Sequence, residues 1–263
     1  MRIAIPRVFN LPTLLFFVAT GVLFVGCSGG EPRYQGKTLS KWLILYQNAE
    51  EAGPAERQAE EAIRAIGTNA LPYLTKWIAS DDPEPATQAK EGFKILGPVA
   101  APAVPALTGL LTSTNELVAG MAASALASVG APAVPAMLAA LTNRSYKISL
   151  NAILALPELG TNALPAIPIL RRELEHPNHV YRERAADALG NLRLEPDLVV
   201  PALTNLLQDP SPAARNLAIG SLGRFGPAAR SAVPVIRPFL EYPDFKFVAS
   251  KALKAIAPEV LNQ

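Results

Sequence analysis

Side chains suited to catalysis or metal binding are scarce in this chain of 263 residues, which contains two histidines and one cysteine. His176 and His179 lie three positions apart in the sequence HPNH. Two imidazoles with no third ligand nearby make a poor zinc site, because such sites use three or four protein ligands. The sequence also contains no serine-centred nucleophile elbow, phosphate-binding loop or CxxC pair. We therefore predict that the protein is not an enzyme and holds no metal or cofactor.

Three basic residues of the C-terminal half recur at intervals of 33 and 31 residues, each seven positions before a leucine: Arg182, Arg215 and Lys246. We call them the basic row. Asp209 lies six residues before Arg215. Two interpretations stay open, namely hydrogen bonds that join neighbouring structural units, or a positive strip that binds a carboxylate-rich peptide or polymer.

Bulkier side chains are also expected on the exposed faces of the helices that carry the basic row. They are Glu183, Asp187, Asn191, Asn216, Arg224, Phe247 and Lys251. From this set we predict that Asp187, Asn191, Arg224 and Lys251 contribute to partner binding together with the basic row.

The single cysteine follows a segment typical of an export signal. Arg2 and Arg7 precede an uncharged run over residues 11–26, which is short for a membrane-spanning helix. The sequence FVGC resembles the lipobox of bacterial lipoproteins, with Phe24 where that family usually has leucine. The resemblance implies cleavage before Cys27 and acylation of its side chain. An ordinary signal peptide and an uncleaved anchor remain the alternatives.

The same resemblance predicts how the chain is divided into segments and where in the cell the protein lies. It implies a signal peptide over residues 1–27, a flexible tether over 28–37 and a folded part over 38–263. Ser28 stands where aspartate favours inner-membrane retention in enteric bacteria. We therefore expect a periplasm-facing lipoprotein of the bacterial cell envelope, at the outer membrane.

The charge balance argues against a nucleic-acid partner. Without Arg2 and Arg7, the 24 basic residues become 22 and equal the 22 acidic ones. A neutral protein has no overall field that would steer it onto a polyanion. We likewise expect no small-molecule substrate, because no candidate catalytic group was found.

A repeat of about 30 to 33 residues fills the rest of the chain. Its prolines are spaced by 33, 30, 33, 33 and 33 residues: Pro72, Pro105, Pro135, Pro168, Pro201 and Pro234. The position 25 residues after each of the first five is glycine, except at Arg193: Gly97, Gly130, Gly160, Arg193 and Gly226. A constant block with variable links is typical of stacked structural units.

Each block predicts two helices. Apolar residues after each proline follow the i, i+3, i+4 pattern of a short amphipathic helix, with the proline in its first turn, where a missing N–H costs little. A longer helix follows with the pattern Ala-x-x-Ala-Leu or a close variant, as in MAASALASVG and LAIGSLGRFG. The final glycine suits a left-handed helix cap. Neither helix buries its apolar stripe alone, so the units must stack.

The segment DPSPAARNLAIGSLGRFGPAARSAVPVIRPFLEYPD resembles HEAT repeats, especially the short variety of phycobilin-lyase-like proteins. The resemblance covers residues 38–261 and implies an all-α, right-handed solenoid of about seven stacked antiparallel helix pairs. Residues 37–48 and 54–67 would form a first pair that caps the stack. HEAT arrays mostly serve as binding scaffolds, so the resemblance implies a protein or peptide partner.

These observations favour a membrane-anchored protein-interaction scaffold without catalysis. Two alternatives remain: a structural envelope protein that associates with its own copies, and a chromophore lyase or chaperone-like enzyme suggested only by the repeat subtype.

Overall fold

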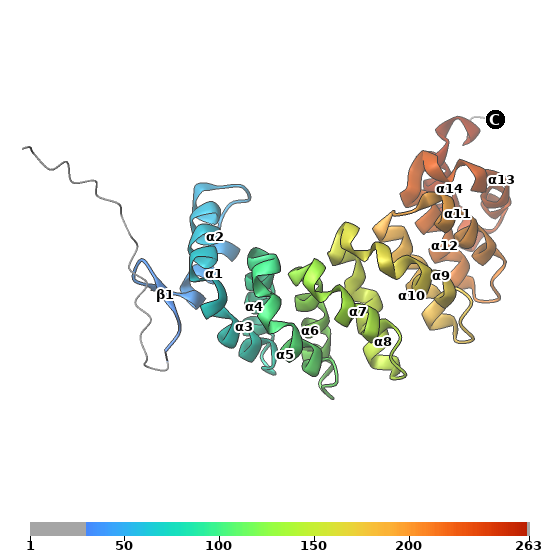
Figure 1. The fold of residues 1–263 in the computed structure, drawn as a ribbon. Helices are drawn as coiled ribbons and strands as arrows, with labels where there is room; N and C mark the ends of the chain where they lie inside the picture. The colour runs from blue at the N-terminus through green and yellow to red at the C-terminus, as the bar shows by residue number, and fades with distance from the viewer. Residues whose placement is uncertain (1–29, 262–263) are drawn as a thin grey trace, which may run out of the picture.

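The computed structural model describes residues 30–261 and shows an all-α solenoid (Figure 1). Its helices form seven consecutive pairs: α1 (Leu39–Gln47) with α2 (Pro54–Ile66), α3 (Leu71–Ile78) with α4 (Pro83–Leu96), α5 (Val104–Leu110) with α6 (Glu116–Val129), α7 (Val134–Leu141) with α8 (Tyr146–Ala155), α9 (Ile167–Glu173) with α10 (His179–Leu192), α11 (Pro196–Asn205) with α12 (Pro212–Phe225), and α13 (Val233–Ile236) with α14 (Pro243–Ile256). The predicted solenoid of about seven pairs is confirmed.

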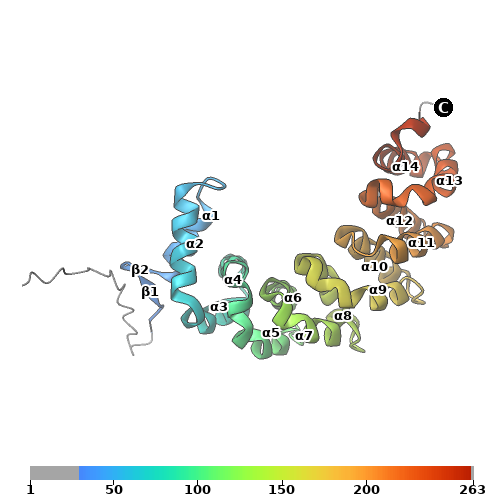
Figure 2. The same ribbon diagram turned by 45° about the horizontal axis from the view of Figure 1, so that its top comes forward.

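The pairs stack side by side into an open arc (Figure 2). The second helices α4, α6, α10, α12 and α14 lie along its inner side, and the first helices α3, α5, α11 and α13 lie along its outer side. Second helices pack on one another from unit to unit, most extensively α10 on α12 and α12 on α14. We call these two sides the inner face and the outer face.

Small residues allow the second helices to pack closely. In α10 the Ala-x-x-Ala-Leu pattern falls on Ala185, Ala188 and Leu189, all of which are buried. The unpaired backbone N–H groups at the starts of the second helices find hydrogen-bond partners nearby. In α6 the Asn115 side chain accepts hydrogen bonds from the first of these N–H groups. Ser211 does the same for α12. The core is therefore one continuous layer of alanine and branched aliphatic side chains between the helix rows.

The turn between the two helix rows is formed by glycine in most units. Gly97 and Gly160 have φ of 52° and 55°, both with ψ of −131°. The sign of φ agrees with the predicted left-handed cap, but ψ does not. This backbone region is nearly exclusive to glycine, because a β-carbon there collides with the chain.

Arg193 replaces this glycine in one unit, and the local fold changes with it. Arg193 adopts the left-handed helical conformation (φ 53°, ψ 32°), which a residue with a side chain tolerates better. Glu195 is also left-handed (φ 50°, ψ 57°), and α11 begins directly after it at Pro196. Pro201 therefore lies inside α11, and its predicted first-turn position is wrong.

A β-hairpin covers the N-terminal end of the stack. β1 (Arg33–Tyr34) pairs antiparallel with β2 (Lys37–Thr38). The buried Trp42 donates its indole N–H to the Tyr34 carbonyl at 3.0 Å, and the Lys37 ammonium lies 4.4 Å from the Trp42 ring. Residues 30–37 are therefore not the flexible tether that we predicted. Cys27 and the signal segment lie outside the described residues.

Two apolar segments within the described part of the chain pass a length and hydropathy test for membrane spans: Pro83–Leu110 and Tyr146–Glu173. Each contains a glycine of positive φ, Gly97 or Gly160, so neither is one straight helix. Their apolar side chains, such as Phe93 and Ile153, are buried between repeats. Packing within the solenoid thus accounts for part of their hydropathy, while Val99 and Leu154 in the same segments are 52% and 50% exposed.

Candidate functional site

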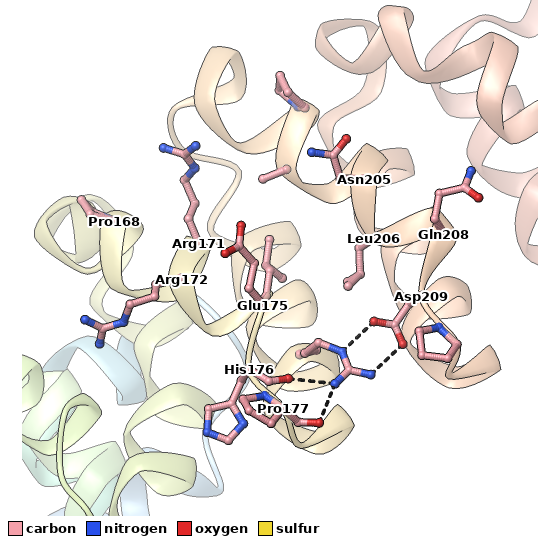
Figure 3. A pocket seen from close by; sticks show the side chains of 15 residues that line it. Pro168, Arg171, Arg172, Glu175, His176, Pro177, Asn205, Leu206, Gln208 and Asp209 are labelled. Atoms are coloured by element: carbon pink, nitrogen blue, oxygen red, sulfur yellow. Dashed lines mark hydrogen bonds and ion pairs between the residues drawn. The ribbon is translucent and has the colours of Figure 1, made fainter.

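The first member of the basic row, Arg182, is held in a junction between two repeats by hydrogen bonds to Asp209, His176 and Pro177, the three partners labelled in Figure 3. Its Nε and Nη2 atoms donate to the two carboxylate oxygens of Asp209 at 2.6 and 2.8 Å. Its Nη1 donates to the carbonyls of His176 and Pro177 at 2.8 and 3.0 Å. The side chains of Arg182 and Asp209 are 12% and 5% exposed. Arg182 is therefore committed to the junction and is not available to a partner.

The same junction sets the charge state of its carboxylate. The hydrogen bond from Arg182 holds the pKa of Asp209 below its ordinary value, while burial of the carboxyl group opposes this and raises the pKa. The Ser211 backbone N–H, which donates to Asp209 at 2.8 Å, lowers the pKa further. Asp209 is thus a charged link between α10 and the turn before α12.

The second member of the row, Arg215, has a related role. Its Nη1 donates to the carbonyls of Asp209 and Pro210 at 2.6 and 3.3 Å, and its guanidinium lies 5.2 Å from the Phe245 ring. Lys246 is exposed, and we find no ion pair for it within residues 30–261. Of the two interpretations of the basic row, hydrogen bonding between units describes Arg182. Arg215 forms its hydrogen bonds within its own unit and contacts the next unit through the Phe245 ring.

A depression of 820 Å³ lies beside this junction, between α9 and α11 (Figure 3). Its walls carry charges of both signs, including Arg171, Arg172 and Glu175. His176 lies at its edge, stacks on Tyr181 with ring centroids 4.1 Å apart, and accepts the Asn178 backbone N–H.

His179 takes a different partner from His176. Its Nδ1 atom lies 2.8 Å from the carboxylate of Glu183. Within residues 30–261, no three histidine, cysteine or acidic residues are placed to hold a metal ion.

The other predicted binding residues gather on the inner face. Arg224 on α12 donates to Asp187 on α10 at 2.8 Å, and Asn191 donates to the other oxygen of Asp187 at 3.3 Å. Lys251 lies on α14, where it borders the same groove as Arg224. The structure thus brings together Asp187, Asn191 and Arg224, and it places Lys251 across a groove from them.

This inner-face groove has a volume of 390 Å³ and lies between α12 and α14. Its lining residues are Asn216, Leu217, Gly220, Gly223, Arg224, Asp244, Phe247, Val248, Lys251, Ala252 and Ala255. A β-carbon on Gly223 would lie 2.9 Å from Ala252 Cα, so the two helices touch there. A β-carbon on Gly220 would lie 3.7 Å from Val248 Cγ2, in ordinary van der Waals contact.

Phe247 is the most exposed large hydrophobic side chain of the described residues, at 82%. The sequence predicted its exposure, but we did not include it among the binding residues. The apolar residues of α14 that face the core are Phe245, Ala249, Leu253 and Ile256. Phe247 lies off that stripe, and this periodicity is the signal that separates it from a core residue.

The family model for HEAT repeats matches residues 103–190 and 167–257 of this chain. Among solved structures, a Kap95p–RanGDP complex aligns with a TM-score of 0.52 and 16% identity, covering 88% of this chain and 36% of the other. Kap121p bound to Pho4p aligns with a TM-score of 0.50 and 17% identity, covering 83% and 29%. This chain thus spans about a third of each of these two proteins.

A complex of CpcE and CpcF of phycocyanin lyase from Nostoc sp. aligns with a TM-score of 0.48 and 22% identity, covering 58% of this chain and 97% of the other. No curated protein matches the sequence. Likeness at these identities concerns the fold alone. The family match covers more than half of the sequence and agrees with the paired helices described above, and the chain therefore belongs to the HEAT-repeat family.

Proposed function

We propose that the protein is a non-enzymatic interaction scaffold that binds a segment of a partner protein in the groove between α12 and α14. The observation that carries the proposal is Phe247, an aromatic side chain 82% exposed at the border of an inner-face groove. Covering such a side chain contributes about 2 kcal/mol, and aromatic residues beside small pockets commonly dominate binding energy.

The groove has a definite chemical character. Leu217 and Val248 provide apolar walls, while Gly220 and Ala255 leave room between them. Lys251 has no ion pair that we find within residues 30–261. The groove therefore suits a partner segment that places an apolar side chain against Phe247 and a carboxylate near Lys251. The Kap121p structure, which is bound to Pho4p, is an example of this fold holding a protein.

The absence of catalysis and the membrane anchor are part of the same proposal. Acylation of Cys27 would attach the scaffold to an envelope membrane on its periplasmic side, with the outer membrane favoured by Ser28. Several acyl chains on one residue would make this attachment stable, because a single chain binds membranes only marginally.

The test is photo-crosslinking in the native host. A photo-reactive amino acid at Asn216, inside the groove, should crosslink to one discrete envelope protein, which mass spectrometry then identifies. The same reporter in a Cys27→Ser background should lose that product if the anchor places the scaffold beside its partner. Crosslinks to further copies of this chain alone would replace the proposal with the self-associating structural role.

Substitution of the exposed aromatic side chain measures its contribution to the affinity for the partner. Phe247→Ala should weaken binding of the identified partner by roughly thirtyfold, which corresponds to about 2 kcal/mol. Leu198→Ala is the matched control, because Leu198 is 47% exposed on α11, in the outer row. Both variants should keep the melting temperature of the parent. Equal affinity in the Phe247→Ala variant and the parent would exclude the groove as the binding site.

A further inference from the structure

The point at which the chain enters the fold is fixed by three hydrogen bonds. The Gly30 carbonyl accepts from Tyr73 Oη at 2.7 Å. The Glu31 carboxylate accepts the Ser40 backbone N–H at 3.0 Å, and the Pro32 carbonyl accepts that of Leu39, also at 3.0 Å. Residues 30–32 are therefore joined to α3 and to the first turn of α1.

The distance from this entry point to the proposed anchor is short. Gly30 follows Cys27 by three residues, and three residues of fully extended chain span at most about 11 Å. An acylated Cys27 would therefore hold Gly30 within about 11 Å of the lipid headgroups. The first turn of α1 would lie farther from them by at most the width of the hairpin. At this distance the N-terminal pair of the solenoid cannot leave the vicinity of the bilayer.

The surface next to this point combines basic and apolar side chains. Lys41, Ile44 and Leu45 lie on the side of α1 opposite its buried residues, and the last two are 42% and 39% exposed. Arg33 is exposed on the hairpin that precedes α1, whereas the Lys37 ammonium lies over the Trp42 ring, on the buried side of α1. We call Arg33, Lys41, Ile44 and Leu45 the N-terminal surface.

The basic side chains of this surface form no ion pair that we find: Arg33 and Lys41 have none within residues 30–261. The neighbouring acid, Glu31, is engaged by the Ser40 backbone N–H. Other acids of the first pair lie toward the far end of α1: Glu50 and Glu51 follow it, and Glu56 and Glu60 on α2 lie near Tyr46.

We propose that the N-terminal surface rests on an anionic lipid bilayer. Basic side chains near such a surface each strengthen attachment by about fivefold. Exposed aliphatic residues such as Ile44 and Leu45 gain by entering the interfacial region. The inference rests on the proposed anchor at Cys27, which keeps the surface and the membrane together at high effective concentration.

This arrangement has a consequence for the groove between α12 and α14. The N-terminal pair and α14 lie at opposite ends of the arc (Figures 1 and 2). A solenoid that rests on the membrane by its first pair therefore presents its C-terminal groove away from the bilayer, where a partner in the aqueous compartment reaches it.

The test uses the full-length acylated protein reconstituted into vesicles of phosphatidylethanolamine and phosphatidylglycerol. Because the chain has one cysteine and acylation blocks it, an Ile44→Cys variant carries a single thiol for an environment-sensitive fluorophore. A Leu198→Cys variant is the matched control, at 47% exposure on an outer helix near the other end of the arc. The fluorophore at position 44 should be blue-shifted by the apolar environment of the bilayer and quenched by spin-labelled lipids, and the one at position 198 should show neither change.

Two further measurements separate the possible failures. Arg33→Gln with Lys41→Gln should lower the ratio of membrane-docked to undocked N-terminal surface by roughly 25-fold, from about fivefold per basic residue, while circular dichroism shows the parent's helix content. If the protein floats with the vesicles but positions 44 and 198 are equally exposed to water, the inference fails and the anchor stands. If mass spectrometry finds no acyl group on Cys27, both the anchor and the inference fail.

Discussion

Replacing Arg182 by methionine should be the most damaging single polar substitution in the solenoid. Methionine keeps most of the apolar stem of arginine but removes two hydrogen bonds to Asp209, at 2.6 and 2.8 Å, and those to the carbonyls of His176 and Pro177. It leaves the Asp209 carboxylate, 5% exposed, with the Ser211 backbone N–H as its remaining donor. Removing one partner of a buried ion pair costs about 3–5 kcal/mol.

The pH dependence of this loss has a definite sign. The hydrogen bond from Arg182 lowers the pKa of Asp209. A carboxyl whose pKa is lower in the folded state contributes stability above its unfolded pKa of about 3.9, and this stability disappears as the pH falls through the folded pKa. The free-energy difference between the parent and Arg182→Met should therefore be full at neutral pH and shrink in acid below the unfolded pKa.

The assay is urea denaturation followed by circular dichroism at neutral and acid pH, with hydrogen exchange to locate the damage. Exchange should accelerate first in α10 and in the turn before α12, because each repeat contacts only its neighbours. Arg184→Met is the matched control, since Arg184 is exposed on the same helix; it should change stability by less than about 0.5 kcal/mol. A loss below about 1 kcal/mol for Arg182→Met, or one independent of pH, would refute the reasoning.

Four other substitutions follow from the packing. Gly223→Ala should destabilise the protein by about 1–3 kcal/mol, because its β-carbon would lie 2.9 Å from the α14 backbone. Gly109→Ala, which has open space around it, should instead stabilise α5 by about 0.5–1 kcal/mol. Urea denaturation measures both effects. Gly160→Ala should cost about 1–3 kcal/mol in the same assay, because φ is 55° there. Trp42→Phe removes the indole donor, so hydrogen exchange should accelerate in residues 33–38.

For each of these substitutions the opposite outcome would contradict a specific part of the reasoning. A stable Gly223→Ala variant would mean that α12 and α14 separate at little cost. Destabilisation by Gly109→Ala would reveal a contact on the outer face of α5. A neutral Gly160→Ala would show that the turn accepts the left-handed helical conformation of Arg193. Unchanged exchange in Trp42→Phe would show that the hairpin is held chiefly by its strand pairing.

The repeat architecture was predictable because its signals are local. A proline near the start of a first helix, an apolar stripe and an alanine-rich second helix each act within a few residues, and their constant spacing predicts stacking. The same local logic failed where a unit departs from the pattern. Arg193 could not adopt the glycine conformation, and this shifted the start of α11 to Pro196.

The prediction of a flexible tether at residues 30–37 failed for a different reason. Residues 30–37 are polar and contain glycine and proline, which is typical of a tether. Their order comes from Trp42 and from Tyr73, which lies 43 residues from its partner Gly30. Composition does not reveal such distant partners.

The sequence by itself determined the helix pairs, their number, their stacking and the exposure of Phe247, because periodicity and turn chemistry are properties of neighbouring residues. Only the tertiary structure decided the roles of the basic row. Arg182 meets Asp209 across 27 residues, and the groove is lined by Gly220 and Arg224 of α12 together with Phe247 and Lys251 of α14. Which side chains become buried or free depends on how one repeat settles on the next, and that contact is made between residues about one repeat apart.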